Sequence, residues 1–155
     1  METMKNTGHL PDLVQINQMK PEDSEQVCRL FENCFAAPWS LQSIEEMFER
    51  PGYYNLVARQ DGGIIGYIGI LAVLDEADIT NVAVHPDHRR RQVGRALLHE
   101  LLELAGQKGI RHIYLEVRRS NEAAIHLYES AGFSGIDIRK NYYEHPAEDA
   151  VIMMR

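Results

Sequence analysis

The sequence predicts an α/β (α+β) fold, in which a mixed and mostly antiparallel sheet of about seven strands is combined with about four helices. Strand-like segments dominate the chain, and helical segments are inserted singly between them. Residues 53–59 and 64–74 flank a glycine-rich turn, which is typical of an antiparallel hairpin. Residues 77–117 read as strand, helix and strand, and this connection implies one parallel pair of strands within the sheet.

The other N-terminal elements follow from local signals. Residues 1–12 are polar and are expected to form a flexible leader, and the alternation that starts at Leu13 predicts a strand. Pro21 opens a predicted helix whose apolar residues fall on one stripe. Ser40 is a suitable N-cap for a second helix, which should end at Pro51.

Strands and helices alternate in the C-terminal half. A strand over residues 77–84 stops at Pro86, and the helix that follows has an apolar face and ends at a glycine. This helix is predicted over residues 94–109. The remaining predicted elements are a strand at 110–117, a helix at 121–131, and strands at 133–138 and 150–154.

The composition describes one globular domain, which we assign to residues 13–155. The chain has 16 basic and 23 acidic side chains, and its net charge of −7 disfavours a general nucleic-acid binder. We find neither a membrane-spanning apolar run nor a secretory signal, so we expect a cytoplasmic protein without a membrane partner. Cys28 and Cys34 should point to different faces of one helix, which predicts free thiols in a reducing compartment.

Residues 81–98 read as a strand, a basic loop and the start of a helix, an arrangement that suits an anionic ligand. The first turn of a helix has free N–H groups and a positive dipole end, and Gly94 allows close approach to the backbone. Arg89, Arg90 and Arg91 oppose that dipole without an anion, which favours an anion site over the alternative of a solvated charge run. Neither the Walker pattern nor the GxGxxG fingerprint occurs, so nucleoside triphosphates and dinucleotides have no motif support.

Residues 91–96, Arg-Gln-Val-Gly-Arg-Ala, resemble the signature loop of the GNAT superfamily, Arg/Gln-x-x-Gly-x-Gly/Ala. The resemblance implies a GNAT fold with a splayed parallel strand pair, and acetyl-CoA as the co-substrate. It further implies that loop amides hold the coenzyme pyrophosphate and that residues 82–84 pair with the pantetheine arm. Many members have glycine at the position of Gln92. The implied coenzyme contacts are Val82, Ala83, Val84, Arg90, Arg91, Gln92, Val93, Gly94, Arg95 and Ala96.

A second group of candidate residues lies on the predicted strand at 110–117 and on the next helix. Alternation separates Glu116 from the apolar face of the strand, and Asn121 and Tyr128 share one helical stripe. Acetyl transfer from a thioester to an amine requires a base for the ammonium proton and an acid for the leaving thiolate, which a glutamate and a tyrosine can provide. From the residues alone, the alternatives are a core aromatic for Tyr128 and a helix N-cap for Asn121.

The stretches 115–121 and 127–133 resemble more specifically the RimI-type ribosomal-protein-alanine N-acetyltransferases. This resemblance implies that Glu116 is the proton acceptor, that Tyr128 is the proton donor and that Asn121 contacts the coenzyme. The likeness extends to segments outside the coenzyme motifs. There it implies three candidate walls of the acceptor site, Trp39, Tyr142 and Tyr143, with half-buried packing as the alternative for the tryptophan.

The same resemblance implies the acceptor, which is expected to be the N-terminal α-amino group of a small-subunit ribosomal protein that begins with alanine. Two alternatives stay open: an acetyltransferase for a lysine or a small-molecule amine, and a coenzyme A-binding or protein-interaction module without turnover. No metal is expected, because no recognised ligand spacing links the four candidate histidines, which are His85, His88, His112 and His126.

Overall fold

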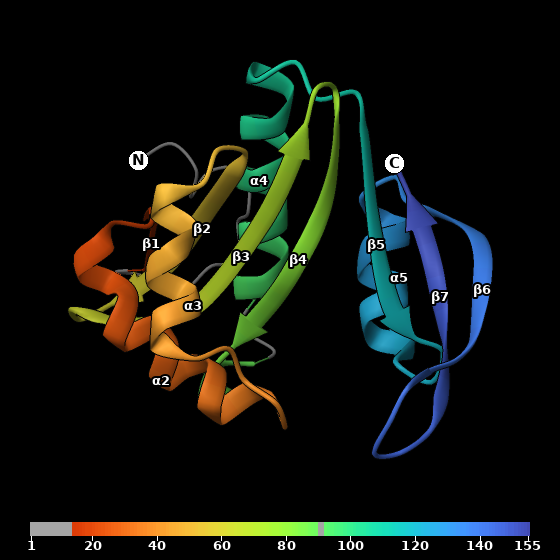
Figure 1. Cartoon of the computed structure of the whole chain (residues 1–155), viewed down its shortest axis with the longest axis horizontal. Coiled ribbons are helices and arrows are strands. Elements are labelled where there is room, and N and C mark those ends of the chain that lie inside the picture. The colour runs from red at the N-terminus through yellow and green to blue at the C-terminus, as the bar shows by residue number, and fades with distance from the viewer. Residues whose placement is uncertain (1–13, 90–91) are drawn as a thin grey trace.

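The computed structural model describes residues 14–89 and 92–155, which form a seven-stranded sheet flanked by helices (Figure 1). The predicted leader at 1–12, Leu13, and two predicted coenzyme contacts, Arg90 and Arg91, lie outside the described residues. The strand order is β1-β2-β3-β4-β5-β7-β6. β4 and β5 are parallel and the other neighbours are antiparallel, which confirms the predicted mixed sheet.

The strand boundaries agree closely with the prediction except near the C-terminus. The sixth strand was predicted to end at Ile138, but β6 continues to Tyr143. This extension is polar and mostly exposed at the edge of the sheet, so it lacks the apolar alternation by which a strand is recognised. The strands are β1 Val14–Gln18, β2 Tyr53–Gln60, β3 Gly63–Val73, β4 Glu76–Val84, β5 His112–Arg118, β6 Ser134–Tyr143 and β7 Glu148–Met154.

Two local signals read from the sequence account for helix ends in the structure. The Ser40 hydroxyl accepts a hydrogen bond from the Ser43 amide at 3.1 Å, which confirms the predicted N-cap. Gly109 has a φ of +77°, as expected of the glycine that ends the long helix. The helices are α2 Ser24–Cys34, α3 Leu41–Glu46, α4 Val93–Gln107 and α5 Glu122–Ser130, with short 3-10 turns η1 Pro21–Asp23, η2 Met47–Glu49 and η3 Pro86–His88.

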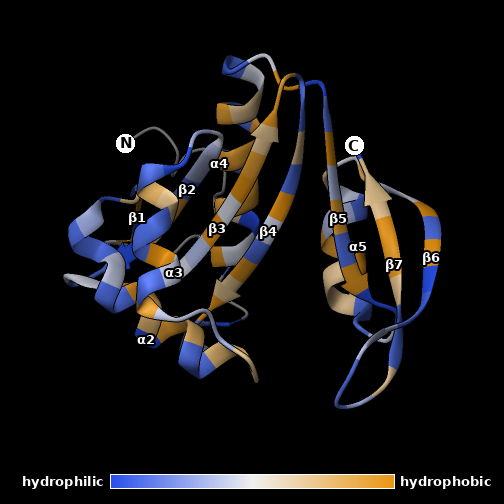
Figure 2. Cartoon of the chain, viewed as in Figure 1, coloured by the Kyte–Doolittle hydropathy of each residue, from blue (hydrophilic) through white to orange (hydrophobic). Residues whose placement is uncertain are grey.

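Apolar clusters fill both faces of the sheet. One cluster includes Leu97 of α4 and Tyr128 of α5, and the other includes Phe31 of α2. β3 contributes to both because successive side chains point to opposite faces, so Ile68 joins the first cluster and Tyr67 the second. Figure 2 accordingly shows β3 as largely hydrophobic. Within the part of the chain that the structure describes, no helix is long and apolar enough to span a membrane.

A buried ion pair fastens the start of α2 to the sheet. Asp23 is 4% exposed, and its Oδ2 atom lies 2.6 Å from the Arg59 guanidinium of β2. The same oxygen accepts a hydrogen bond from the Lys20 amide at 2.8 Å. Burial alone would raise the pKa of the Asp23 carboxyl, but the hydrogen bonds and positive charge of Arg59 and Lys20 outweigh it and leave the pKa lowered. The carboxylate is therefore charged and paired inside the fold.

Candidate active site

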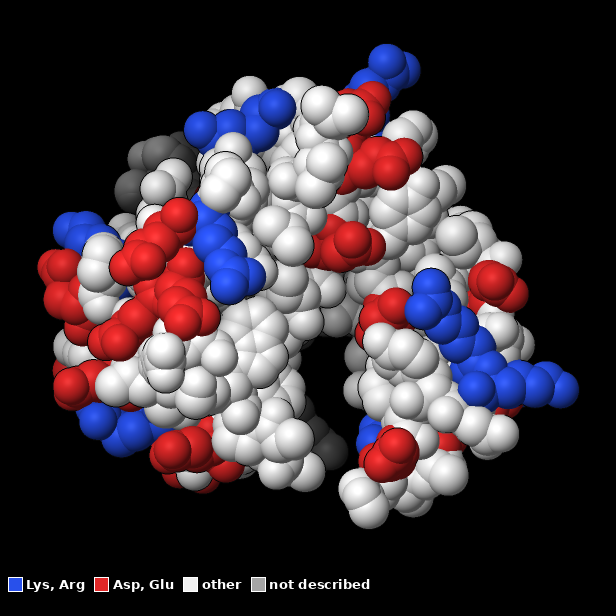
Figure 3. Space-filling view, in the orientation of Figure 1, with Lys and Arg blue, Asp and Glu red and all other residues white. Residues whose placement is uncertain are grey.

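The parallel strands β4 and β5 separate soon after they meet, and a cavity lies between them. They pair only where Glu76–Asp78 faces His112–Tyr114, and the two halves of the sheet then diverge (Figure 1). A cavity of about 390 Å³ lies beyond this pairing, and the space-filling view shows the molecule hollowed on this side (Figure 3). The cavity brings together six of the predicted site residues, Trp39, Val82, Glu116, Asn121, Tyr128 and Tyr143.

Glu116 carries the negative charge of this cavity and is held by two side chains from β6. Burial of Ile113, Leu115 and Val117 leaves Glu116 on the opposite, exposed face of β5, as alternation predicted. Tyr142 donates a hydrogen bond from its phenol to Glu116 Oε1 at 3.0 Å, and Arg139 Nη1 lies 3.9 Å from Oε2. Tyr142 thus contacts Glu116 and does not line the cavity wall itself.

Tyr128 lines the cavity from α5 and is only 8% exposed. Its ring packs edge-to-face on Phe133 at a centroid distance of 5.7 Å, so the core-aromatic interpretation also holds. Burial, reinforced by the nearby Tyr143 phenol, raises the pKa of Tyr128 to about 12. The phenol is therefore protonated at neutral pH, as a proton donor must be.

Two other predicted residues combine packing with a place in the cavity. The Asn121 side-chain oxygen accepts a hydrogen bond from the Ala124 amide at 3.2 Å, which confirms its interpretation as the N-cap of α5. Trp39 is half-buried and packs edge-to-face on Phe31, with centroids 6.0 Å apart. Trp39 also borders a neighbouring cavity of about 310 Å³, so it forms a partition between two hollows.

The predicted anion loop borders another cavity, of about 460 Å³, between the start of α4 and α5. Val84, Gln92, Val93, Gly94 and Arg95 contribute to its lining. The first backbone bond of α4 runs from the Ala96 amide to the Gln92 carbonyl, so the amides before it are the free ones of a helix start. Ala124 borders both this cavity and the one that contains Glu116. The two cavities therefore adjoin each other at α5.

Comparison with known proteins identifies the family. The model of the Acetyltransferase (GNAT) family matches residues 24–133, which is more than half of the chain. The chain belongs to the GNAT acetyltransferase family. It is therefore an acyltransferase, and this family uses acetyl-CoA as the acetyl donor.

Bacterial GNAT proteins match nearly the whole chain. A Bacillus subtilis (strain 168) relative is 40% identical, over 89% of this chain and 92% of its own length. Ribosomal protein bS18-alanine N-acetyltransferase of Escherichia coli (strain K12) is 39% identical, over 89% of this chain and 94% of its own. The crystal structure of the Escherichia coli ribosomal-protein-S18-alanine N-acetyltransferase superposes with a TM-score of 0.85, covering 91% of this chain and 92% of that one at 37% identity.

The residue before α4, Gln92, has a left-handed backbone conformation of the kind that glycine adopts easily. Gln92 has φ 65° and ψ 14°, a left-handed conformation that costs a residue with a side chain about 1 kcal/mol and glycine much less. Gln92 adopts it nonetheless, and its side-chain oxygen accepts a hydrogen bond from Arg95 Nε at 2.9 Å. At Gly94, an added Cβ would come no closer than 3.7 Å to Val84, so the protein itself does not require glycine there.

The GNAT co-substrate fits the residues around these cavities. Beyond Asp78, no strand within residues 14–89 and 92–155 pairs with the edge of β4 that faces β5, so its backbone is accessible from the first cavity, which Val82 lines. The side chains of Ala83, Val93 and Ala96 are buried in the core, so the predicted contacts of Ala83 and Val93 can be made only by main-chain atoms. The Ala96 amide is already bonded to the Gln92 carbonyl, so the structure leaves no free donor for the contact predicted there. Arg90 and Arg91 lie outside the described residues, and their predicted role stays a prediction.

Sequence reasoning missed several residues that line the cavity with Glu116, among them Arg118 and Thr80. Arg118 lies two residues after Glu116 and therefore shares its face of β5, so strand alternation was the available signal for it. Thr80 lies between Ile79 and Asn81, where the register of β3 and β4 shifts, and such an irregularity interrupts alternation, so the sequence offered no comparable signal for Thr80. Arg89, part of the predicted basic loop, donates from Nε to the Val84 carbonyl at 3.0 Å, and Cys34 Sγ lies 3.4 Å from the same oxygen. The thiols of Cys28 and Cys34 are both free.

No group of three or more histidine, cysteine, aspartate or glutamate side chains in residues 14–89 and 92–155 is arranged to hold a metal ion. Two of the four candidate histidines, His85 and His88, make other contacts. His85 accepts a hydrogen bond from the Asp87 amide at its Nδ1 atom, and its ring lies edge-to-face on His88.

Proposed function

We propose that this acetyltransferase transfers the acetyl group of acetyl-CoA to the N-terminal α-amino group of ribosomal protein bS18, whose first residue is alanine. The observation that carries this proposal is the near full-length likeness to the Escherichia coli enzyme named for that acceptor. The proposed setting is the bacterial cytoplasm, where ribosomal proteins are made, and residues 13–155 are proposed to act as one domain.

The proposed co-substrate site runs along β4 and the start of α4. The free amides of Gln92, Val93, Gly94 and Arg95, together with Arg90 and Arg91, would hold the coenzyme phosphates, whereas the Ala96 amide already donates to the Gln92 carbonyl. The main chain of residues 82–84 would hold the pantetheine arm, and Asn121 would contact the coenzyme from the start of α5. When bound, acetyl-CoA supplies a thioester whose carbonyl carbon accepts the amine nitrogen. This proposal is supported by the position of the two cavities, one at the start of α4 and the other at Glu116, with Ala124 in the lining of both.

The electrostatics around Glu116 support an amine as the acceptor. Burial chiefly raises the pKa of the Asp78 carboxyl, and the nearby negative charges of Glu116 and Glu76 add to the rise, so the two glutamates contribute a negative potential where β4 and β5 pair. An ammonium group is attracted to such a potential. An α-amino group has a pKa of about 8, so it needs only a modest base to become the neutral nucleophile.

We assign the proton transfers to Glu116 and Tyr128. Glu116 accepts a proton from the acceptor ammonium, and the freed amine forms a C–N bond as the C–S bond breaks. Tyr128 donates its proton to the departing sulfur and regains one from the acetylated nitrogen through water. The nitrogen thus loses two protons in all and the sulfur gains one, so one proton reaches solvent for each acetyl group transferred.

The elevated pKa of Tyr128 limits how this donor can act. A thiol has a pKa of about 8.5, so complete transfer from a phenol of pKa about 12 is uphill, and the proton can move only as negative charge develops on sulfur. Before that moment the phenol provides a hydrogen bond to sulfur. The buried phenolate left by the transfer is then reprotonated by the proton from the acetylated nitrogen.

The acceptor is proposed to enter between Trp39 and Tyr143. Both line the cavity that contains Glu116, one from the segment between α2 and α3 and the other from the end of β6. Tyr142, the third predicted wall residue, instead supports Glu116 through its hydrogen bond. The two aromatic walls would flank a short side chain such as that of alanine.

The proposal is tested with synthetic acceptors and mass spectrometry. A peptide with the bS18 N-terminus is compared with the same peptide blocked at its α-amino group but retaining its lysines, and with a polyamine. We expect one acetyl group, at the α-nitrogen, and at least tenfold lower kcat/KM for the other acceptors. Preferred turnover of the blocked peptide or the polyamine would replace this acceptor by a lysine or a small amine. Acetyl-CoA binding without turnover of any amine would reduce the chain to a binding module.

A further inference from the structure

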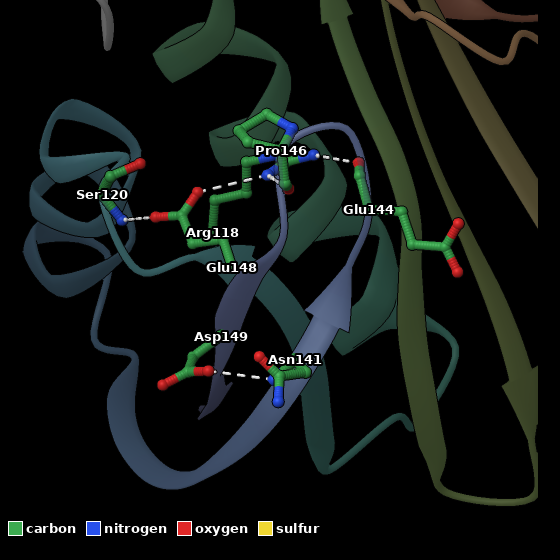
Figure 4. Close-up of polar contacts among 7 residues, drawn as sticks. All are labelled: Arg118, Ser120, Asn141, Glu144, Pro146, Glu148 and Asp149. Carbon is green, nitrogen blue, oxygen red and sulfur yellow. Dashed lines mark hydrogen bonds and ion pairs between the residues drawn. The ribbon is translucent and has the colours of Figure 1, made fainter.

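Arg118, at the end of β5, makes a dense set of contacts with the connection between β6 and β7 (Figure 4). Its Nη2 atom donates to the Glu144 carbonyl at 3.1 Å, and Nη1 donates to the Pro146 carbonyl at 3.0 Å. Nη1 also lies 3.2 Å from Glu148 Oε1. One side chain thus fixes both sides of the turn that follows β6.

Glu148 extends this connection to the start of α5. Its second oxygen, Oε2, accepts a hydrogen bond from the Ser120 amide at 2.6 Å (Figure 4). The hydrogen bonds of Ser120 and Arg118 lower the pKa of the Glu148 carboxyl, so it is charged at neutral pH. Because Ser120 is held by Glu148 and not by the guanidinium, the N-cap at Asn121 does not depend directly on Arg118.

Tyr143 is the cavity residue that Arg118 contacts. The guanidinium carbon lies 4.5 Å from the centre of the Tyr143 ring, within the range of a cation–π interaction. Arg118 and Tyr143 both line the cavity with Glu116, which lies on the same face of β5 as Arg118. The position of this aromatic wall relative to Glu116 is therefore set through the guanidinium.

The contacts require the shape of arginine and not its charge alone. Two backbone carbonyls, a carboxylate and an aromatic face are satisfied at once by the planar guanidinium, whereas a lysine ammonium offers a point charge that cannot reproduce this geometry. The next residue provides a matched contrast. Arg119 pairs at 3.5 Å with Asp149, the second residue of β7, but it does not line the cavity.

We infer that Arg118 is a positioning residue for the acceptor: it holds Tyr143 and the β6–β7 turn at the distance from Glu116 that acceptor binding requires. This inference rests on the proposed function, because it names the residue that shapes the proposed acceptor entrance. No role in proton transfer is assigned to Arg118.

The test compares Arg118→Lys with Arg119→Lys in steady-state assays of a bS18 N-terminal peptide. For R118K we expect the acceptor KM to rise about tenfold or more, with kcat and the acetyl-CoA KM within about threefold of wild type. R119K should leave all three parameters within about twofold. A fall in kcat at unchanged acceptor KM, or equal effects of the two variants, would refute the positioning role.

A double-mutant cycle separates positioning from general support of the fold. In a Tyr143→Ala background, R118K should change the acceptor KM by less than about twofold, because the residue through which it acts is gone. Additive effects would overturn the inference. The acetyl-CoA dissociation constant, measured for every variant, verifies that each is folded. If the wild-type enzyme acetylates the peptide and R118K behaves like wild type, this inference fails while the proposed function stands.

Discussion

The Tyr142 phenol donates a hydrogen bond to Glu116 Oε1 across 3.0 Å, joining an edge strand to the proposed base. This contact, followed by partial burial, raises the pKa of Tyr142, so the phenol remains a donor throughout the physiological range. One oxygen of Glu116 is thereby occupied, and Arg139 is near the other at 3.9 Å. The acceptor ammonium must approach a carboxylate whose orientation is already set.

Replacing Tyr142 by phenylalanine removes that hydrogen bond while retaining the ring. Because a hydrogen bond to a charged group contributes about 1.5 kcal/mol or more, we expect kcat/KM for the acceptor to fall about tenfold or more. Steady-state kinetics in wild-type and Glu116→Gln backgrounds measure the effect. A similar loss in the E116Q background would show that Tyr142 acts independently of Glu116.

Tyr128→Phe should remove the proposed proton donor without disturbing the site. We expect kcat to fall about 100-fold or more, because a positioned acid contributes that much, while the acetyl-CoA dissociation constant stays within about threefold. Tyr54→Phe is the control, since Tyr54 contacts Lys108 and borders a different cavity. Full activity of Y128F would remove the donor role.

Alkaline pH should destabilise the fold through its buried phenols. Burial raises the pKa of Tyr128 to about 12 and that of Tyr67 even further, whereas unfolded tyrosines ionise near 10. The unfolded state therefore loses protons first, and the stabilisation, complete below about pH 10, is lost as the pH rises toward 12. Urea unfolding at pH 9, 10 and 11 should show this decline, and the Y128F variant should reduce its slope. Equal slopes would contradict the burial argument.

Gly94→Ala tests whether the start of α4 contacts a ligand. The new methyl group would have ordinary van der Waals distances within the protein, 3.7 Å at the closest, so we expect the thermal midpoint to be kept or raised. Acetyl-CoA affinity should fall about tenfold or more, because the methyl group occupies the space of close backbone approach. Gly106→Ala, in an open position of the same helix, should gain helix propensity without losing affinity. Equal affinity of the two variants would contradict a ligand at Gly94.

Asp23→Ala should reveal the cost of breaking the buried pair with Arg59. Removal of one partner leaves a charge that is only partly solvated, so we expect the free energy of unfolding to fall by about 3 kcal/mol. Glu46→Ala removes an exposed pair with Arg50, 3.9 Å apart, and should cost about 0.5 kcal/mol or less. Chemical denaturation measures both. Losses of similar size would mean that burial does not control the strength of these pairs.

Features that depend on neighbouring residues in the chain could be predicted from the sequence. Alternation placed Glu116 opposite the buried face of β5, and local caps located Ser40 and Asn121 at helix starts. The parallel pair followed from connection length. These signals are local or follow from topology, so they can be recognised in the sequence alone.

The contacts that shape the acceptor side could not be predicted in the same way. Arg118 binds carbonyl groups of Glu144 and Pro146, and backbone acceptors leave no residue-type signature in a sequence. The contact of Tyr142 with Glu116 depends on the register of β6, which shifts between Arg139 and Tyr143. A single slipped residue would direct that phenol to the other face of the sheet.

The short parallel pairing of β4 and β5 has a mechanical consequence. Hydrogen bonds join these two strands along only three residues of each, so the sheet is weakest across its own middle. This short pairing lies beside the cavity that a substrate must enter. A ligand bound between β4 and β5 contacts both halves of the sheet, which few hydrogen bonds connect directly. The rigidity of the sheet therefore depends on whether this site is occupied.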